Sequence, residues 1–383
     1  MATSIDYTSR ARKIAYRYPR LSFLGIQVNF WIIAIFLHAF ITHMHTAYMG
    51  QFQEVTFPLS FKAVILTSVL VGGTLGIVLG TIDLLLIKLG FQKLSFGRMI
   101  LLRIIIYPIV VLGLLLFIRF FLLDFISAFL ATDYSILGNS QVSWHYFFWS
   151  LLVYIAFTAV VISFINQMNN MFGPGILIPL LLGRYRRPQE EERFFMFLDL
   201  KSSVTHAENL GHLEYSALIR DCFMDLNKVL ARNNAAIYQY VGDEAVLTWP
   251  VYEATRKQAC LSLFFDFEQE LIQKSQYYTS HYGSVPTFKA GLHFGLVTAV
   301  EVGQIKREIA YHGDAINTAA RIQSLCNQYN RSFLVSKPAM TMLAGADSKY
   351  KFEYLGEINL KGKTKATELY AISNPASKPQ MAK

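Results

Sequence analysis

Four long apolar runs constrain the fold of this 383-residue chain more than any other feature. They cover approximately residues 24–46, 61–87, 99–123 and 145–168. Each run is long enough for a helix that crosses a bilayer core of about 30 Å. Hydrophobic residues make up 53% of the chain and charged residues only 16%, and the apolar excess lies within residues 21–182. We therefore expect an α-helical, four-span membrane domain followed by a soluble half of ordinary composition.

Basic residues predict how these spans are oriented. Lys and Arg are plentiful before the first run, between the second and third, and directly after the fourth. The loops near 48–57 and 124–144 contain neither residue. The positive-inside rule then places both termini in the cytoplasm of a multi-pass protein of the cell membrane. No small-residue cleavage site follows the first run, so we expect an uncleaved anchor.

The net charge of +9 has the same explanation. Much of it flanks the apolar runs, so we expect the lipid bilayer as a partner and no nucleic acid. The three cysteines, Cys222, Cys260 and Cys326, show no metal-ligand spacing and are expected to be free thiols of a reducing compartment.

An ionisable residue inside a membrane span costs free energy, so its presence points to a partner or a function. Asp83 and Arg103 lie near the predicted cytoplasmic ends of consecutive spans, and we expect them to form an ion pair. Arg119 and Asp124 are expected to pair near the outer side.

Histidines gather at the outer end of the first span. They are His38, His43 and His45, and His145 begins the fourth span. One interpretation is a metal or haem sensor site, and the other is interfacial histidines in contact with water and lipid headgroups. We favour the second, because no carboxylate or cysteine completes a ligand set.

The soluble half carries two acidic motifs at strand ends. In the first, Phe197-Leu198-Asp199-Leu200, an apolar strand ends at an aspartate. In the second, Val241-Gly242-Asp243-Glu244, the aspartate lies in a compact hairpin turn. Paired carboxylates of this kind are suited to hold Mg²⁺ against a nucleoside triphosphate. Further along, Asn317 and Arg321 are one helical turn apart and therefore share a face.

Together these stretches resemble the catalytic domain of the class III nucleotidyl cyclases, the family that makes cyclic AMP or cyclic GMP. The resemblance implies an α+β fold with a ferredoxin-like, palm-like βαββαβ core. It also implies two Mg²⁺ or Mn²⁺ ions per active site, held by Asp199 and Asp243. Asn317 would hold the ribose, and Arg321 would stabilise the charged transition state. The phosphate-binding residues would be Leu200, Lys201, Ser202, Ser203 and, near the C-terminus, Lys361 or Lys363.

Active sites of this family form between two catalytic domains, which implies a homodimer with two equivalent sites. The positions that select the base correspond to Gln239 and Ala310, and neither matches the residues usual in adenylate or in guanylate cyclases. A glutamine can both donate and accept hydrogen bonds, so it is compatible with either base. We favour ATP as the substrate.

The sequence thus predicts a membrane-bound adenylate cyclase regulated through its membrane domain by an unknown ligand or partner. The alternatives are a guanylate cyclase that uses GTP and a catalytically silent nucleotide-binding receptor. We expect a basic N-terminus (1–23), a transmembrane domain (24–168), a linker (169–193), a cyclase domain (194–373) and a tail (374–383). The linker, broken by Gly173-Pro174-Gly175, is expected to couple the two halves, and the alternative is a passive tether.

Overall fold

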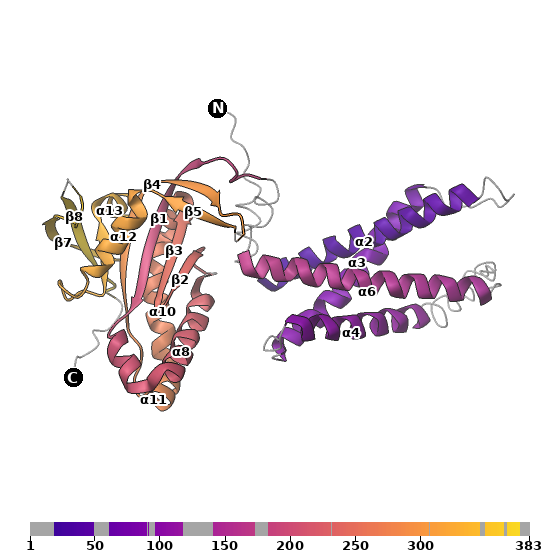
Figure 1. Cartoon of the computed structure of the whole chain (residues 1–383), viewed down its shortest axis with the longest axis horizontal. Coiled ribbons are helices and arrows are strands. Elements are labelled where there is room, and N and C mark those ends of the chain that lie inside the picture. The colour runs from indigo at the N-terminus through magenta and orange to yellow at the C-terminus, as the bar shows by residue number, and fades with distance from the viewer. Residues whose placement is uncertain are drawn as a thin grey trace. The chain divides into compact units, whose positions relative to one another are not determined.

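The computed structural model describes residues 19–49, 61–89, 91, 96–117, 141–172, 183–230, 232–305, 307–344, 349–363 and 366–375. The chain divides into two compact units, Met1–Leu177 and Ile178–Lys383 (Figure 1). The first is helical, and the second combines one sheet with helices. This confirms the predicted succession of fold types along the chain.

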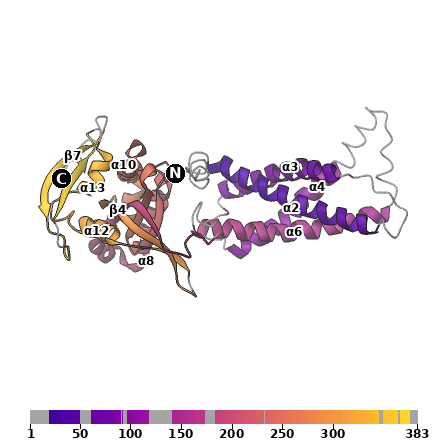
Figure 2. The same cartoon turned by 90° about the horizontal axis from the view of Figure 1, so that it is seen from above.

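Among its described residues, the first unit contains four long helices (Figure 2). They are α2 (Pro19–Met49), α3 (Phe61–Lys88), α4 (Phe96–Phe117) and α6 (Gln141–Phe172). Each contains a segment long and apolar enough to cross a membrane: Arg20–His45, Val64–Leu86, Gly97–Leu114 and Trp149–Met168. The four candidate spans are therefore confirmed, whereas the side on which each end lies stays a prediction.

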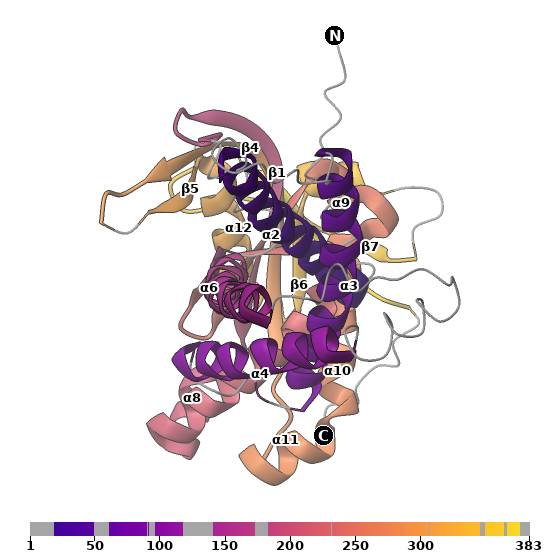
Figure 3. The same ribbon diagram turned by 90° about the vertical axis from the view of Figure 1, so that its right-hand side faces the viewer.

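Small residues allow α2 and α3 to approach closely, as the view in Figure 3 illustrates. Gly72, Gly76 and Gly80 recur every four residues along α3 and so share one face. A Cβ at Gly76 would lie 2.5 Å from the backbone Cα of Val28, and Gly72 meets the α2 backbone in the same way. In a bilayer, where apolar surface gains nothing by leaving lipid, such close backbone packing is a main source of helix association.

A polar connection joins the other helices. Arg103 Nε lies 3.0 Å from Asp83 Oδ1, which confirms the predicted ion pair between α4 and α3. Arg103 Nη1 also donates to Ser163 Oγ on α6 at 3.1 Å. All three residues are buried. Arg119 and Asp124, the second predicted pair, lie outside the described residues.

The histidines of α2 contact aromatic rings. The centroids of His38 and Tyr154 are 4.8 Å apart, and those of His43 and Phe61 are 6.4 Å apart. Within the described parts of the chain, no group of three or more His, Cys, Asp or Glu side chains is arranged to hold a metal ion. The side chain of His145 lies outside the described residues.

The second unit is built on one eight-stranded sheet, with strand order β2-β3-β1-β4-β6-β8-β7 and β5 paired to β4. All pairings are antiparallel except that of β4 with β6. The strands are β1 (Gln189–Leu200), β2 (Ala236–Val241), β3 (Glu244–Pro250), β4 (Phe288–Val302), β5 (Glu308–His312), β6 (Phe333–Ser336), β7 (Lys351–Ile358) and β8 (Thr367–Ser373). β1 begins within the segment expected to link the halves.

Helices cover both faces of this sheet. α8 (Ser203–Leu230), α10 (Ala259–Gln273) and α11 (Ser275–Tyr282) gather on one side (Figure 1). Their apolar faces and the even-numbered residues of β1 form the main core, together with residues of α9 (Val251–Thr255) and α13 (Lys337–Leu343). The opposite face is covered by α12 (Asp314–Ser324), whose apolar contacts form a smaller cluster around Phe195. The order β4-β1-β3-β2, with α8 and α10 as connections, confirms the predicted ferredoxin-like βαββαβ core.

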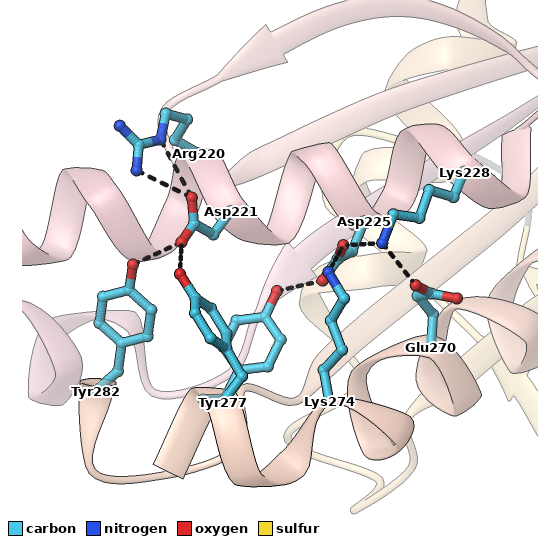
Figure 4. Close-up of polar contacts among 9 residues, drawn as sticks. Arg220, Asp221, Asp225, Lys228, Glu270, Lys274, Tyr277 and Tyr282 are labelled. Carbon is cyan, nitrogen blue, oxygen red and sulfur yellow. Dashed lines mark hydrogen bonds and ion pairs between the residues drawn. The ribbon is translucent and has the colours of Figure 1, made fainter. Parts of the chain in front are cut away.

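A polar network fastens α8 to α10 and α11 (Figure 4). Asp225, only 2% exposed, accepts hydrogen bonds from Lys274 and Tyr278 and pairs with Lys228. Burial by itself would raise the pKa of Asp225, but these donors lower it overall. One turn earlier, Asp221 accepts hydrogen bonds from two tyrosine hydroxyls of α11. The three cysteines are free and buried, as predicted for free thiols.

The buried ion pair of the helical unit makes a testable prediction. Arg103→Met leaves the Asp83 carboxylate buried without its partner, which should cost about 3–5 kcal/mol of stability. The double variant Asp83→Leu/Arg103→Met removes both charges and should recover most of this loss. Thermal unfolding in lipid nanodiscs measures both. Thr81→Val, an exposed change on α3, is the control. A double variant as unstable as the single one would contradict the interpretation.

Candidate active site

Asp199 lies at the end of β1, between two strands that fix its surroundings. β1 pairs with β3 and with β4, which places Asp199 opposite Glu244 on one side and Lys289 on the other. Opposite residues of antiparallel strands project to the same face, so all three side chains lie on the α12 face of the sheet. Lys289 Nζ is 3.1 Å from Asp199 Oδ2, and Gln323 Nε2 of α12 donates to the same oxygen at 2.8 Å.

Asp243 reaches this place through the hairpin of β2 and β3. It follows Gly242, whose φ of 60° is the left-handed conformation that a tight hairpin turn requires. Because Glu244 is the register partner of Asp199, the preceding residue, Asp243, is brought beside it. The structure thus brings together the two aspartates that the sequence analysis assigned to metal binding.

The acidic groups are held close together against their mutual repulsion. Burial, followed by the charge of Asp243, raises the pKa of Asp199, and Lys289 and Gln323 oppose this shift. Burial and then the charges of Asp199 and Asp243 raise the pKa of Glu244 to about 7. A divalent cation would relieve this repulsion, and Mg²⁺ commonly uses one or two carboxylates together with substrate phosphates. The donor set therefore fits Mg²⁺ or Mn²⁺.

The predicted phosphate loop follows Asp199. Leu200 is buried, and Ser202, with a φ of 54°, turns the chain so that Ser203 begins α8. The backbone amide of Lys201 already donates to the Thr287 carbonyl, and its Nζ donates to Ser332 Oγ at 2.6 Å. The amides available to a phosphate are therefore those at the beginning of α8, where the helix dipole also favours an anion.

Asn317 and Arg321 lie on α12. Asn317 is exposed and Arg321 half-buried, and four residues separate them on one face of the helix. The loop that carries Lys361 and Lys363 lies beside them: a Cβ at Gly362 would be 3.5 Å from Arg321 Nη2. The structure therefore brings together the predicted catalytic pair and the predicted lysine region.

The two lysines of this loop differ. Lys363 Nζ lies 2.7 Å from Asp314 Oδ2 at the first turn of α12, and its side chain is 18% exposed. Lys361 is exposed. Lys363 is therefore fixed to α12, and Lys361 is the lysine whose side chain reaches solvent beside Arg321.

The acidic group and the Asn317–Arg321 group lie on opposite faces of α12. Gln323, 6% exposed, points to the sheet and reaches Asp199. Arg321, two residues earlier, points about 200° away, because each helical residue turns the direction by about 100°. Arg321 therefore points away from the aspartates of its own chain.

Gln239 and Ala310, the predicted base-selecting positions, lie in β2 and β5. Their neighbours Tyr238 and Tyr311 are in contact, with ring centroids 5.1 Å apart. Gln239 is the register partner of Val246 and so lies on the α12 face of the sheet. Ala310 is paired with Val300, one position from Tyr311, and so points to the opposite face.

Lys289 and Gln323, the two residues bonded to Asp199, were not predicted from the sequence. Lys289 is opposite Asp199 only because β4 pairs with β1, and strand order cannot be read from either strand alone. Gln323 follows Arg321 by two residues, and its only signal is its place in the buried stripe of an amphipathic helix. A third neighbour is Tyr215 of α8, whose hydroxyl pKa is raised by burial and then by Asp243.

Comparisons show which known proteins this chain is similar to. Residues 187–374 match the family described as the adenylate and guanylate cyclase catalytic domain. Adenylate cyclase 2 of Rhizobium meliloti (strain 1021) is 36% identical over 214 residues, which cover 56% of this chain and 59% of that protein. Adenylate cyclase 1 of the same organism is 26% identical over 194 residues, 49% of this chain and 28% of that protein.

Among solved structures, a bacterial light-regulated adenylyl cyclase aligns with a TM-score of 0.48 and 19% identity, over 56% of this chain and 64% of its own. The chain spans less than two thirds of the length of the two Rhizobium meliloti relatives.

A half-buried glutamate near the phosphate loop predicts a pH dependence of stability. Burial raises the pKa of Glu268 on α10 from 4.5 to about 7, and the charge of Lys201 opposes the shift. The native state then holds more protons than the unfolded state between pH 4.5 and 7, so wild-type stability falls as the pH rises through this window. Glu268→Gln should remove the part of this loss that Glu268 causes, with a gain over wild type of at most about 3 kcal/mol above pH 7, at about 1.4 kcal/mol per pKa unit.

Thermal unfolding of the full chain at pH 5 and pH 8 measures the difference. Glu208→Gln, an exposed change on α8, is the matched control and should keep the wild-type dependence of stability on pH. An equal effect of Glu268→Gln at both pH values would contradict the assignment.

Proposed function

Because residues 187–374 belong to the adenylate and guanylate cyclase catalytic domain family, we propose that this chain is a membrane-bound adenylate cyclase. It converts ATP into cyclic AMP and pyrophosphate at two sites, each formed by two copies of the chain. The proposed sites use Asp199 and Asp243 of one copy with Asn317, Arg321 and Lys361 of the other.

The proposal of a shared site rests on one observation: the acidic group and Arg321 lie on opposite sides of α12. Asp199 meets the sheet-facing side of this helix through Gln323, whereas Arg321 projects from the other side. A single site needs both a cation-binding carboxylate pair and a cationic group over the transferred phosphate. A two-fold dimer satisfies both needs at once, because each copy offers its Arg321 face to the acidic group of the other.

In the proposed reaction the ribose 3′-oxygen bonds to the α-phosphorus, the bond from this phosphorus to the bridging oxygen breaks, and pyrophosphate leaves. Divalent ions held by Asp199 and Asp243 would lower the pKa of the 3′-hydroxyl and neutralise charge on the phosphates. The guanidinium of Arg321 suits the spread negative charge of a pentavalent phosphorus. Asn317, one turn earlier, orients the ribose, and Lys361 and the first amides of α8 bind the departing phosphates.

ATP is the proposed substrate, supported by the 36% identity to a protein named adenylate cyclase 2. Gln239 can both donate and accept hydrogen bonds, whereas the Ala310 side chain can form none. Two alternatives follow: a guanylate cyclase that uses GTP, and a silent nucleotide-binding receptor. The presence of Asp199, Asp243 and Arg321 together favours an active enzyme over a silent receptor.

The four-helix unit is proposed to anchor the enzyme and to regulate it, with both termini in the cytoplasm. The Lys and Arg residues before the first span, between the second and third, and between the fourth span and β1 support this orientation. The buried polar connection of Asp83, Arg103 and Ser163 links three of the four spans. A change in this unit would pass from α6 towards β1, the strand that carries Asp199. The ligand or partner that causes the change is not identified by these features.

The product assay tests the proposal directly. Purified protein incubated with ATP and Mn²⁺ or Mg²⁺ should form cyclic AMP, and little cyclic GMP should form from GTP. Asp199→Ala and Asp243→Ala should each lower the rate about 100-fold or more, because each removes a cation ligand. Cyclic GMP alone would favour the guanylate cyclase, and no product at all would favour the silent receptor.

Mixing inactive chains tests the shared site. Co-expression of Asp199→Ala chains with Arg321→Ala chains should restore about a quarter of the wild-type activity, because about half the dimers are mixed and each holds one complete site of two. Asp199→Ala mixed with Asp243→Ala is the matched control and should restore nothing, because both changes damage the same half of the site. Equal rescue in the two mixtures would contradict the arrangement.

Substrate selection makes a separate prediction. Gln239→Lys, at the position on the α12 face of the sheet, introduces a residue usual in adenylate cyclases and should raise the ratio of kcat/KM for ATP to that for GTP about 10-fold or more. Val241→Thr, at an exposed position of the same strand, is the control. An unchanged ratio would mean that other groups read the base.

A further inference from the structure

The amide of Gln323 is placed where it can orient a carboxylate and carry a signal. Its Nε2 donates to Asp199 Oδ2 at 2.8 Å, and the residue is 6% exposed. Lys289 approaches the same oxygen at 3.1 Å. Two donors on Oδ2 fix the rotation of the carboxylate and direct Oδ1 away from them. Gln323 does this without charge, so its hydrogen bond orients Asp199 without competing electrostatically with a cation.

The backbone of α12 leaves little freedom at this position. A Cβ on Gly291 of β4 would lie 2.2 Å from the backbone N of Gln323 and 2.6 Å from the carbonyl oxygen of Ala319. The helix therefore rests directly on the strand backbone. Its sheet-facing residues Ala319 and Ile322 are fully buried. Between such tightly packed surfaces, a shift of Asp199 is transmitted to the helix rather than absorbed by it.

The same helix carries Arg321 on its other side. Gly362 packs beside this guanidinium, and Lys363 is bonded to Asp314 at the first turn. The Arg321 side of α12 and the lysine loop therefore form one connected group. In the proposed dimer, Gln323 contacts the aspartate of one active site while Arg321 serves the other.

We propose that Gln323 is the positioning residue of Asp199 and that it couples the two active sites of the dimer through α12. A cation and nucleotide bound at Asp199 of one site change the position of α12. The Arg321 that serves the second site moves with this helix. This inference rests on the proposed function. Two binding measurements, which need no catalytic turnover, distinguish a failure of the inference from a failure of the proposed function.

The first measurement is Mn²⁺ binding to the full chain by isothermal titration calorimetry. Gln323→Met keeps the length of the side chain but removes the donor, and it should weaken Mn²⁺ binding about 10-fold, as loss of an outer-shell partner of a metal ligand typically does. Gln328→Met, an exposed change just after α12, is the matched control and should bind as wild type. Far-ultraviolet circular dichroism confirms that both variants fold. Unchanged Mn²⁺ affinity in a folded Gln323→Met protein would overturn the positioning role.

The second measurement is the binding of 3′-deoxy-ATP, which lacks the attacking hydroxyl, at saturating Mn²⁺. Wild type should bind this analogue with a Hill coefficient different from 1, and Gln323→Met should bring it to 1. The mixed dimer of Asp199→Ala and Arg321→Ala chains, with one complete site, gives the uncoupled reference. A wild-type coefficient of 1, or one that Gln323→Met leaves unchanged, would overturn the coupling. If both binding measurements give the expected results but no cyclic product forms, the proposed reaction would be wrong and the proposed coupling would stand.

Discussion

The antiparallel pairing of β1 with both β3 and β4 is the interaction on which the rest of the second unit depends. It sets Asp199 opposite Glu244 and Lys289, and it brings the turn of the next hairpin, with Asp243, to the same edge. Because side chains alternate between faces, a slip of one residue in either register would turn Asp199 into the main core and expose an apolar neighbour. The packing of the even-numbered residues of β1 against α8 and α10 therefore also fixes the position of the acidic group.

The acidic group shows how far sequence reasoning extends. Asp199 lies at a strand end and Asp243 in a glycine-containing turn, and a few adjacent residues determine the geometry of each motif. The structure brings the two aspartates together as expected. Asn317 and Arg321 were predictable for the same reason, because four residues on a helix always share a face. The contacts of Lys289 and Gln323 with Asp199 depend instead on strand order and on the seating of α12. These are long-range properties that no short window of sequence contains.

The helical unit follows the same division. The number of spans could be predicted because length and hydropathy are local, and the Asp83–Arg103 pair because unpaired charges in a membrane are costly. The close approach of α2 and α3 at Gly72 and Gly76 requires that particular faces of the two helices meet. Because both helices are apolar all round, their composition does not determine which faces these are. Both kinds of contact serve one purpose. They supply the specific helix–helix association that apolar surface alone would not give within a bilayer.

In the proposed dimer, the two faces of α12 explain why one copy of the chain would supply only half of each site. A helix that packs on the sheet through Ala319 and Ile322 must direct Arg321 outward, away from the aspartates of its own chain. No local adjustment can reverse this, because turning the helix would expose its buried face and bury a guanidinium and an amide. In this proposal, the requirement for a second copy follows from the amphipathic pattern of the eleven residues of α12. The hydrogen bond from Gln323 to Asp199 connects the buried face of α12 to the acidic group, while Arg321 projects from the other face of the same helix.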